Sequence, residues 1–239
     1  MSELGEPYIP AYESPLELTK RVIIVGILLG ILMTAANAYL GLYAGMTVSA
    51  SIPAAVMSMI ILSSLFKNVS ILENNAVQTM ASAGESLAAG IIFTVPALLV
   101  IPNMWDEIKL VETTIIALIG GLLGTMFTIA LRRLFIVEEA LPYPEGVACR
   151  EVLVAGEEGG EGAQAILYAL GIGAIYGLVV KGFNATHHTV EGAFQFLSTR
   201  LYAGMDLSVA LLSVGFIVGI RIASYIFMGG VIGFGILVP

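Results

Sequence analysis

The sequence has little charge and only one cysteine. Of its 239 residues, 12% are Asp, Glu, Lys or Arg and 58% are hydrophobic, and the mean hydropathy is +0.95. This balance lies far outside the composition of water-soluble proteins. Cys149, as the single cysteine, excludes an internal disulfide framework. The net charge of −8 gives no reason to expect binding to nucleic acid.

Several signatures of catalysis and nucleotide binding are also missing. The chain has no phosphate-binding glycine motif, which argues against an ATP-driven pump, and no HExxH or CxxC metal pattern. His187, His188 and Glu191 are close in sequence, but structural or exposed histidines fit this spacing better than a metal site. We therefore expect no enzyme, no cofactor and no bound metal. No cleavable signal peptide is evident, because the residues before the first apolar run are acidic and contain proline.

Long hydrophobic segments dominate the chain instead. Six are long enough, or nearly so, to cross about 30 Å of hydrocarbon at about 1.5 Å per residue. They cover approximately residues 22–43, 46–66, 76–101, 113–131, 163–180 and 207–228. A seventh, residues 229–238, is too short to span and stops at Pro239. The sequence predicts an all-α, polytopic transmembrane helical bundle of about six spans with a truncated seventh.

Small residues and a short connection predict how these helices pack. Glycines recur four apart, among others in the pairs 26/30, 41/45, 120/124, 173/177, 215/219 and 229/233, which allows the close helix contacts that are typical of membrane bundles. Only a few residues join the first two segments, so they form either a tight hairpin or an element that is broken within the membrane. Pro53 lies in the second segment, where proline is a usual cause of a helix kink.

The positive charges predict the orientation in the membrane. Most of them fall on one side when the six segments alternate across the bilayer: Lys20, Arg21, Lys67, Arg132, Arg133 and Arg150. Because cytoplasmic loops are enriched in Lys and Arg, this side is expected to be cytoplasmic. We therefore predict a cytoplasmic N-terminal segment (1–21) and a transmembrane domain (22–239) with a cytoplasmic loop at about 134–162. The expected location is the inner (plasma) membrane.

Polar side chains occur within the third apolar segment. On a helix that advances 100° per residue, Asn74, Gln78, Ser82 and Glu85 lie within about 80° of one another. Such groups cost roughly 2.5–3.5 kcal/mol each when ionisable and facing lipid, so they need partners or a water-filled cavity. Glu73, by contrast, is placed to cap the start of the helix.

Within this segment, Glu85 is the strongest candidate for a carboxyl group that carries a proton. Burial would favour its neutral form, whereas a nearby cation would favour its charged form. The residues around it are small, mostly Ala, Gly and Ser, which leaves room for a ligand or for a break in the helix. Asn75 is included among the candidate substrate-binding amides.

Two further polar residues lie in apolar segments, and each has two interpretations. Asn37 shares one face of the first segment with Gly26, Gly30 and other small residues. It either forms a hydrogen bond across a helix-packing seam or faces the same cavity as the third-segment amides. Arg221 either extends to the cytoplasmic interface or pairs with Glu85 or an anionic group of a substrate.

The predicted cytoplasmic loop contains a proline-rich turn, Leu-Pro-Tyr-Pro-Glu-Gly, at residues 141–146. The two prolines favour an extended turn, and residues 145–153 are compatible with a short helix. An ordinary connector is the default interpretation, and a rigid gate or hinge near a cavity is the alternative.

Three stretches of the sequence resemble one known family. The segments NAYLGLYAGMTVSASIPAAV (37–56), ILENNAVQTMASAGESLAAGIIFTVPALL (71–99) and LPYPEGVACREVLVAGE (141–157) are similar to the oligopeptide transporter family. The resemblance is to its prokaryotic branch, related to the yellow-stripe-like carriers, and to the N-terminal portion only. It implies a polytopic secondary carrier of more than six spans for small peptides, glutathione-like compounds or metal chelates, driven by protons.

The sequence thus favours a secondary active transporter that works by alternating access. The expected substrate-binding residues are Asn37, Asn74, Asn75, Gln78 and Arg221, with Glu85 as the proton-coupling residue. The expected partners are the lipid bilayer, a small-molecule or peptide substrate and protons, together with either a second copy of the chain or the remainder of a longer one. A membrane-embedded metal-dependent enzyme and a non-transporting assembly subunit are the alternatives.

Overall fold

The computed structural model describes residues 8–237, except for residues 11, 45–46, 48, 103, 140, 142, 180–188, 197–198 and 207–208. The chain forms two compact units, residues 1–157 and 158–239, which are described separately. The elements of the first unit are α1 (Lys20–Ala44), α2 (Ser51–Leu65), α3 (Ile71–Thr94), α4 (Ala97–Val100), α5 (Leu110–Arg132), η1 (Arg133–Glu138) and α6 (Pro144–Glu158). Those of the second are α7 (Gly160–Gly177), β1 (Thr189–Phe196), β2 (Thr199–Asp206), α8 (Val209–Ile232) and η3 (Gly233–Leu237).

The expectation of a helical, multi-pass membrane protein is confirmed. Among the described residues, four helical segments are long and apolar enough to cross a membrane: Lys20–Tyr43, Ile71–Val100, Leu110–Glu138 and Gly215–Ile232. They correspond to the first, third, fourth and sixth predicted segments. The fifth predicted segment forms α7, which is not among the four. The antiparallel hairpin β1–β2 is an additional element that the hydropathy pattern did not indicate.

The second predicted segment forms a shorter helix than expected. Helix α2 has 15 residues, which corresponds to about 22 Å at 1.5 Å per residue and is less than the thickness of the hydrocarbon core. It begins at Ser51, so Pro53 lies in its first turn. Proline is tolerated there because the first N–H groups of a helix have no partner within the helix. The predicted kink at Pro53 is therefore wrong.

The predicted seventh segment is not a separate helix. Residues 229–232 continue α8, and residues 233–237 form η3. The interruption lies earlier, at Gly219, whose φ of 77° is non-helical and divides α8 into two helices. This conformation favours glycine, because a side chain at positive φ is strained.

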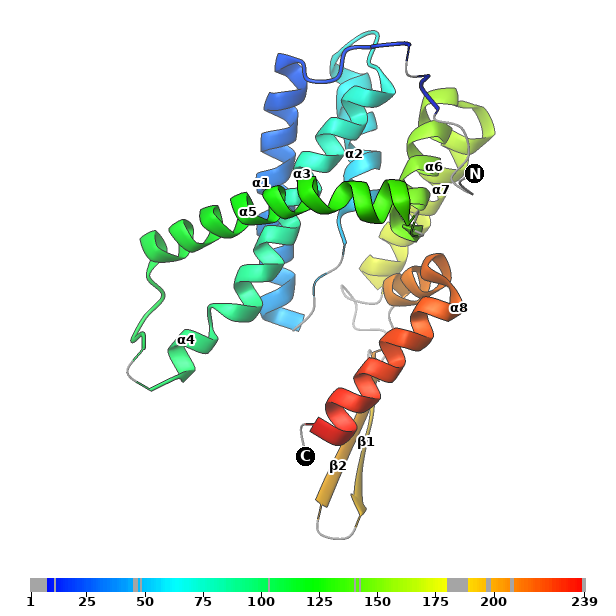
Figure 1. The fold of residues 1–239 in the computed structure, drawn as a ribbon. Helices are drawn as coiled ribbons and strands as arrows, with labels where there is room; N and C mark the ends of the chain where they lie inside the picture. Colours follow the sequence, from blue (N-terminus) through cyan, green and yellow to red (C-terminus); the bar gives the residue numbers. More distant parts are fainter. Residues whose placement is uncertain are drawn as a thin grey trace. The chain divides into compact units, whose positions relative to one another are not determined.

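Helices α1, α2 and α3 form the core of the first unit (Figure 1). Helix α2 runs antiparallel to α1 and α3, and α1 packs more extensively against α3 than against its neighbour in sequence, α2. Their shared apolar cluster consists of Val22, Val25, Leu29, Ala54, Leu62, Ala76, Val77 and Ala81. The starts of α1 and α3 therefore lie together with the end of α2.

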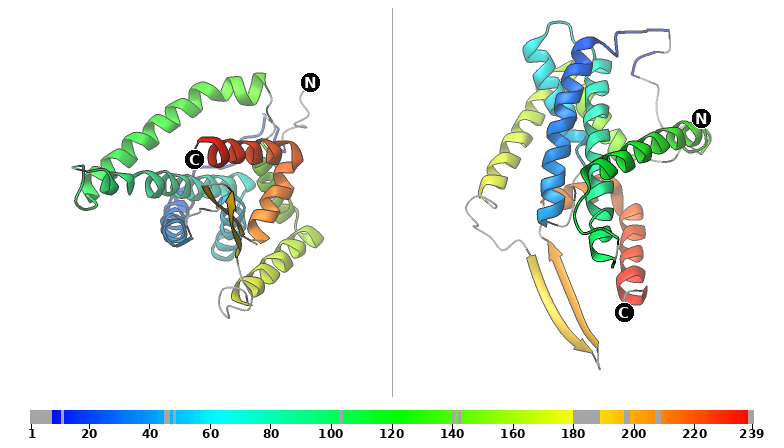
Figure 2. Two further views of the ribbon diagram at one scale, coloured as in Figure 1. Left: turned by 90° about the horizontal axis from the view of Figure 1, so that it is seen from below. Right: turned by 90° about the vertical axis from the view of Figure 1, so that its left-hand side faces the viewer.

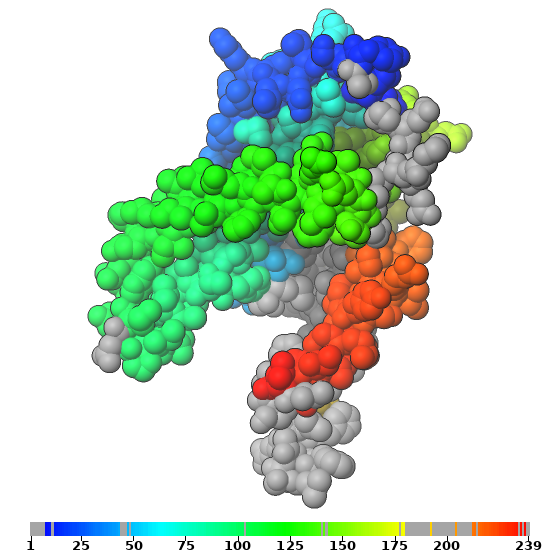
Figure 3. All heavy atoms as spheres, viewed as in Figure 1, coloured from blue at the N-terminus to red at the C-terminus, as the bar shows by residue number. Residues whose placement is uncertain are grey.

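Helix α5 crosses the three-helix core and none of its residues is buried. It extends away from the core at one end, as two further views show (Figure 2). In the space-filling view α5 lies over the front of these helices (Figure 3). The hydrogen bonds that the polar face of α3 makes to other helices go to α1 and α2.

Candidate functional site

Helix α3 turns most of its polar stripe towards its neighbours. Asn74, Gln78 and Glu85 are buried, with 4%, 8% and 6% of their surfaces exposed, and Ser82 is half-buried. Asn75 is exposed, and it lies about 100° from Asn74, beyond Ser82 at the edge of the stripe. The structure thus brings Asn74, Gln78 and Glu85 onto one inward face and leaves Asn75 outside it.

The deepest contact of this face joins α3 to α1. The Asn37 side-chain amide (Nδ2) donates a hydrogen bond of 2.5 Å to Glu85 Oε1, and both residues are buried. Glu85 lies fourteen residues after the start of α3 at Ile71, which corresponds to about 21 Å along the axis. That position is close to the middle of the span Ile71–Val100. Asn37 was expected to face inward, either across a helix-packing seam or into a cavity. In the structure it is buried and faces α3.

A series of hydroxyl groups leads from α3 towards the surface. The side chains of Ser82 and Ser51 lie 3.0 Å apart (Oγ to Oγ), and either can be the donor. Ser49 Oγ donates to the carboxylate of Glu145, and the Oγ atoms of Ser49 and Ser51 are 3.3 Å apart. Ser49, Ser51 and Glu145 were not among the predicted site residues. The proline-rich turn before Glu145 was the only signal for them.

One amide on the polar face has an acceptor without a partner. Among the side-chain atoms of the described residues, Asn74 Oδ1 is buried and accepts no hydrogen bond. The backbone carbonyl of the same residue accepts from Ser58 Oγ at 3.2 Å. Gln78, one turn further along α3, accepts from Thr79 Oγ1 through its Oε1 at 3.4 Å. A buried acceptor without a partner is costly and suits a ligand or water that donates to it.

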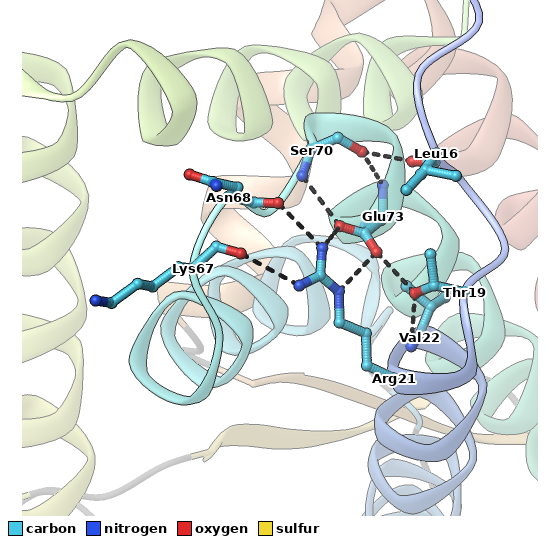
Figure 4. Close-up of polar contacts among 8 residues, drawn as sticks. All are labelled: Leu16, Thr19, Arg21, Val22, Lys67, Asn68, Ser70 and Glu73. Carbon is cyan, nitrogen blue, oxygen red and sulfur yellow. Dashed lines mark hydrogen bonds and ion pairs between the residues drawn. The ribbon is translucent and has the colours of Figure 1, made fainter.

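Glu73 caps α3, as the sequence predicted, and also holds an ion pair (Figure 4). Its carboxylate accepts from Arg21 Nε at 2.8 Å and from Arg21 Nη2 at 2.5 Å. Thr19 Oγ1 and the backbone N–H of Ser70 also donate to it, at 2.7 and 3.2 Å. Ser70 Oγ accepts from the Glu73 backbone N–H and completes a capping box. This group of contacts joins the start of α1 to the start of α3.

Arg21 also binds the loop between α2 and α3. It donates to the backbone carbonyls of Lys67 and Asn68, at 3.3 and 3.0 Å. Asn68 has a φ of 56°, a left-handed conformation that asparagine tolerates better than most residues. Arg21 thus binds both the turn before α3 and Glu73 at the start of α3. These contacts hold the start of α1 against the start of α3.

Glycines make the contact between α1 and α3 close. A Cβ atom on Gly84 would lie 2.5 Å from Thr34 Oγ1 and 3.2 Å from the carbonyl oxygen of Gly30. Beside this contact is an open, mainly apolar groove of about 470 Å³ that includes Gly26, Gly30, Thr34, Met80 and Gly84. The predicted seam of small residues on the first segment is therefore a helix-packing surface.

Two other predicted groups lie elsewhere. Arg221 is an exposed residue of α8 in the second unit. His187 and His188 lie outside the described residues. Within the part of the chain that the structure describes, no three His, Cys, Asp or Glu residues form a group that could hold a metal ion.

Cys149 offers a test of how α6 packs. It is buried, and its Sγ donates to the carbonyl oxygen of Ser51 at 3.9 Å. Burial raises the pKa of its thiol, and the negative charge of Glu145 raises it further. The thiolate is the reactive form, so labelling by a maleimide should be slower in the folded than in the unfolded protein. Labelling should accelerate only at a more alkaline pH than for a free thiol. Mass spectrometry of the Cys149 peptide over time measures this, and equal rates with and without denaturant would contradict it.

Comparison with known proteins identifies the family. Residues 17–239 match the family described as "OPT oligopeptide transporter protein". A Haemophilus influenzae protein named "Putative oligopeptide transporter" is 41% identical over 206 residues, which cover 84% of this chain and 32% of that protein. The chain thus spans about a third of the length of this relative. No solved structure matches the chain. On the strength of the match over almost its whole length, the chain belongs to the OPT oligopeptide transporter family.

Proposed function

We propose that this chain forms part of a secondary active transporter that moves small peptides, or peptide-like or metal-chelate solutes, across the membrane together with protons by alternating access. Membership of the oligopeptide transporter family supports transport as the general activity. The chain spans about a third of the length of its relative. The substrate class and the use of protons are therefore proposed here. Substrate passage requires polar groups inside the bilayer, which lipid-facing helices avoid.

The observation that carries the proposal is the buried contact between Asn37 and Glu85. It lies near the middle of a candidate span. An amide suits a carboxyl group that changes its protonation state, because it can donate to the carboxylate or accept from the carboxylic acid. None of the ion pairs among the described residues involves Glu85. A carboxyl group without a fixed cation can take up and release a proton more readily than one in an ion pair.

The amides of the same face are proposed to bind the substrate. Asn37, Asn74 and Gln78 line the inward side of α1 and α3, and the free acceptor Asn74 Oδ1 suits an N–H group of a peptide bond. Asn75 and Arg221 remain predicted substrate-binding residues. Asn75 is exposed in this chain, so it would act only if a substrate or another segment reached that side of α3.

The proposed setting is the inner (plasma) membrane, with the N-terminus in the cytoplasm. Arg21 contacts the carbonyl of Lys67, so these two cations and Lys20 lie at the same end of the three-helix core. Clustering of positive charges at one end supports a cytoplasmic location for that end.

Replacing Glu85 tests the proposal. In proteoliposomes that contain the whole protein, uptake of tritium-labelled tetra-alanine is expected to depend on the pH gradient. The Glu85→Gln variant keeps the size and the hydrogen-bonding capacity of the side chain but carries no proton. We expect its uptake to fall by about tenfold or more and to lose its pH dependence.

The matched control is Glu112→Gln, which makes the same substitution at an exposed residue in the first turn of α5. It should leave both uptake and pH dependence unchanged. Insertion of each variant is checked by size-exclusion chromatography in detergent. Uptake by Glu85→Gln with the wild-type pH profile would refute the role of Glu85. Wild-type protein that takes up no tetra-alanine under any gradient would refute peptide transport.

A further inference from the structure

Helix α6 packs lengthwise on α2, although its residues belong to the predicted loop between spans. Cys149 contacts the carbonyl of Ser51 near the start of α2, and Gly156 lies against Met59 in its middle. Because both contacts advance in the same direction along the two helices, α6 runs parallel to α2. A buried cluster that includes Cys149, Leu153 and Ala55 closes this contact. The first turn of α2 therefore lies at the level of the first two turns of α6.

That level coincides with the middle of α3. Ser51, in the first turn of α2, lies within hydrogen-bonding distance of Ser82, which is one helical turn from Glu85. Side chains three residues apart on a helix are neighbours on its surface. The start of α6 thus approaches the depth of Glu85, about 21 Å from the beginning of α3 by helix geometry.

Glu145 occupies the first turn of α6. Its carboxylate accepts a hydrogen bond from Ser49, which connects through Ser51 to Ser82. Exposure falls along this series: Glu145 and Ser49 are exposed, Ser51 and Ser82 are half-buried, and Glu85 is buried. The series therefore connects the surface of the first unit with the neighbourhood of Glu85.

The charges around this series are few. Among the described residues, neither Glu85 nor Glu145 forms an ion pair. Arg150, the basic residue of α6, pairs with Glu151. The titratable groups that face Glu145 are Glu85 on α3 and Cys149 on its own helix.

We propose that Glu145 is the outer carboxyl group of a proton path whose inner carboxyl group is Glu85, with the hydroxyl groups of Ser49, Ser51 and Ser82 between them. The inference rests on the proposed function, and it adds the route by which the coupling proton reaches the site. A proton from solvent binds a carboxylate oxygen of Glu145. Each hydroxyl then accepts one proton and releases its own to the next acceptor, and the last transfer, from Ser82 to Glu85, crosses one turn of α3. Glu85 ends protonated, Glu145 is ionised again, and the three serines are unchanged.

The test compares the pH dependence of uptake between variants of the whole protein in proteoliposomes. Tritium-labelled tetra-alanine reports uptake, and the dye pyranine trapped in the vesicles reports the protons that enter. For Glu145→Gln we expect the pH profile of uptake to differ from that of the wild type and the number of protons per peptide to fall. Ser49→Ala interrupts the path but retains both carboxyl groups, and it should lower the proton entry rate without a comparable shift in pH.

Two controls distinguish a role in coupling from a role in folding. Glu157→Gln removes the same charge from an exposed position of the same helix, and it should match the wild type in both readouts. Glu145→Asp keeps the carboxyl group, so its pH profile should stay closer to that of the wild type than the profile of Glu145→Gln does. A variant that only damages folding would lower the amount of inserted protein and leave the pH profile of the remainder unchanged.

The outcomes distinguish the role of Glu85 as the coupling site from the path through Glu145. If wild-type protein transports with protons and Glu85→Gln does not, but Glu145→Gln has the wild-type pH profile, the path through Glu145 is refuted and the proposed function stands. If Glu85→Gln and wild type behave alike, the coupling site itself is refuted, and the path with it. A shifted profile in Glu145→Gln, a normal one in Glu157→Gln and slower proton entry in Ser49→Ala would support the path.

Discussion

The Arg21→Met variant is expected to unfold at a temperature on the order of 10 °C below the wild type. The side chain of Glu73 is only 1% exposed, and Arg21 is its cationic partner through two hydrogen bonds (Figure 4). Removing one member of such a pair leaves an uncompensated charge, which costs far more than the intact pair contributes. The variant also loses the two bonds from Arg21 to the backbone of the loop before α3.

Thermal unfolding of the purified protein in detergent measures the effect, followed by intrinsic fluorescence. Arg133→Met is the control, because its ion pair with Glu138 is exposed, at 84% and 50% of the two side chains. Exposed pairs contribute little, so that midpoint should move by about 2 °C or less.

A double substitution identifies the cause of the loss. Adding Glu73→Gln to Arg21→Met removes the uncompensated charge and retains a side chain that can cap α3. The double variant should therefore be more stable than Arg21→Met alone. If it is equally or less stable, the effect of Arg21 comes from its loop contacts and not from the charge of Glu73.

The second large effect is expected at the crossing of α1 and α3. Gly84→Leu introduces a Cβ within 3.2 Å of the backbone oxygen of Gly30 and closer still to Thr34. Backbone cannot move aside as a flexible side chain does, so the helices must separate. We expect a loss of about 1–3 kcal/mol in the free energy of unfolding. Uptake should fall as well, because Glu85 is the next residue and its contact with Asn37 crosses the same interface.

Gly90→Leu is the matched control for this substitution. It lies on the same helix, and a Cβ at that position meets no atom within 4 Å among the described residues. Its unfolding temperature should equal that of the wild type or exceed it, since leucine favours helix more than glycine does. Gly26→Ala should have an intermediate effect, because its nearest neighbour is the flexible side chain of Met80. Equal losses for Gly84→Leu and Gly90→Leu would contradict the role assigned to this crossing.

Hydropathy and helical spacing were sufficient to predict much of the first unit. The apolar runs located α1, α3 and α5, because a span must satisfy its backbone within one helix. The 100° rotation per residue placed Asn74, Gln78 and Glu85 on one face. The inward direction of Asn37 followed from its small neighbours. Helical spacing alone did not exclude Asn75, which lies beside Ser82 at the edge of the stripe and is exposed in the structure.

The remaining features depend on contacts between distant segments. Residues 46–50, Met-Thr-Val-Ser-Ala, do not interrupt the hydrophobic segment with a charge or a proline, so hydropathy could not show that α2 begins only at Ser51. Helix α6 has a mixed composition and reads as a loop until Cys149 and Leu153 meet Ala55, almost a hundred residues earlier. The place of Glu145 in the proposed path depends on the same packing, because its contact with Ser49 forms only when α6 packs against α2.

The preference of α1 for α3 over α2 has a consequence for biosynthesis. Helix α1 leaves the ribosome first, but its main packing partner is made only after α2 and the turn at Asn68 have been synthesised. Until then Arg21 has no counter-charge, and the glycine face of α1 has no helix against it. We therefore expect α1 and α2 to remain beside the insertion machinery until α3 arrives, and the three helices to enter the lipid as one unit.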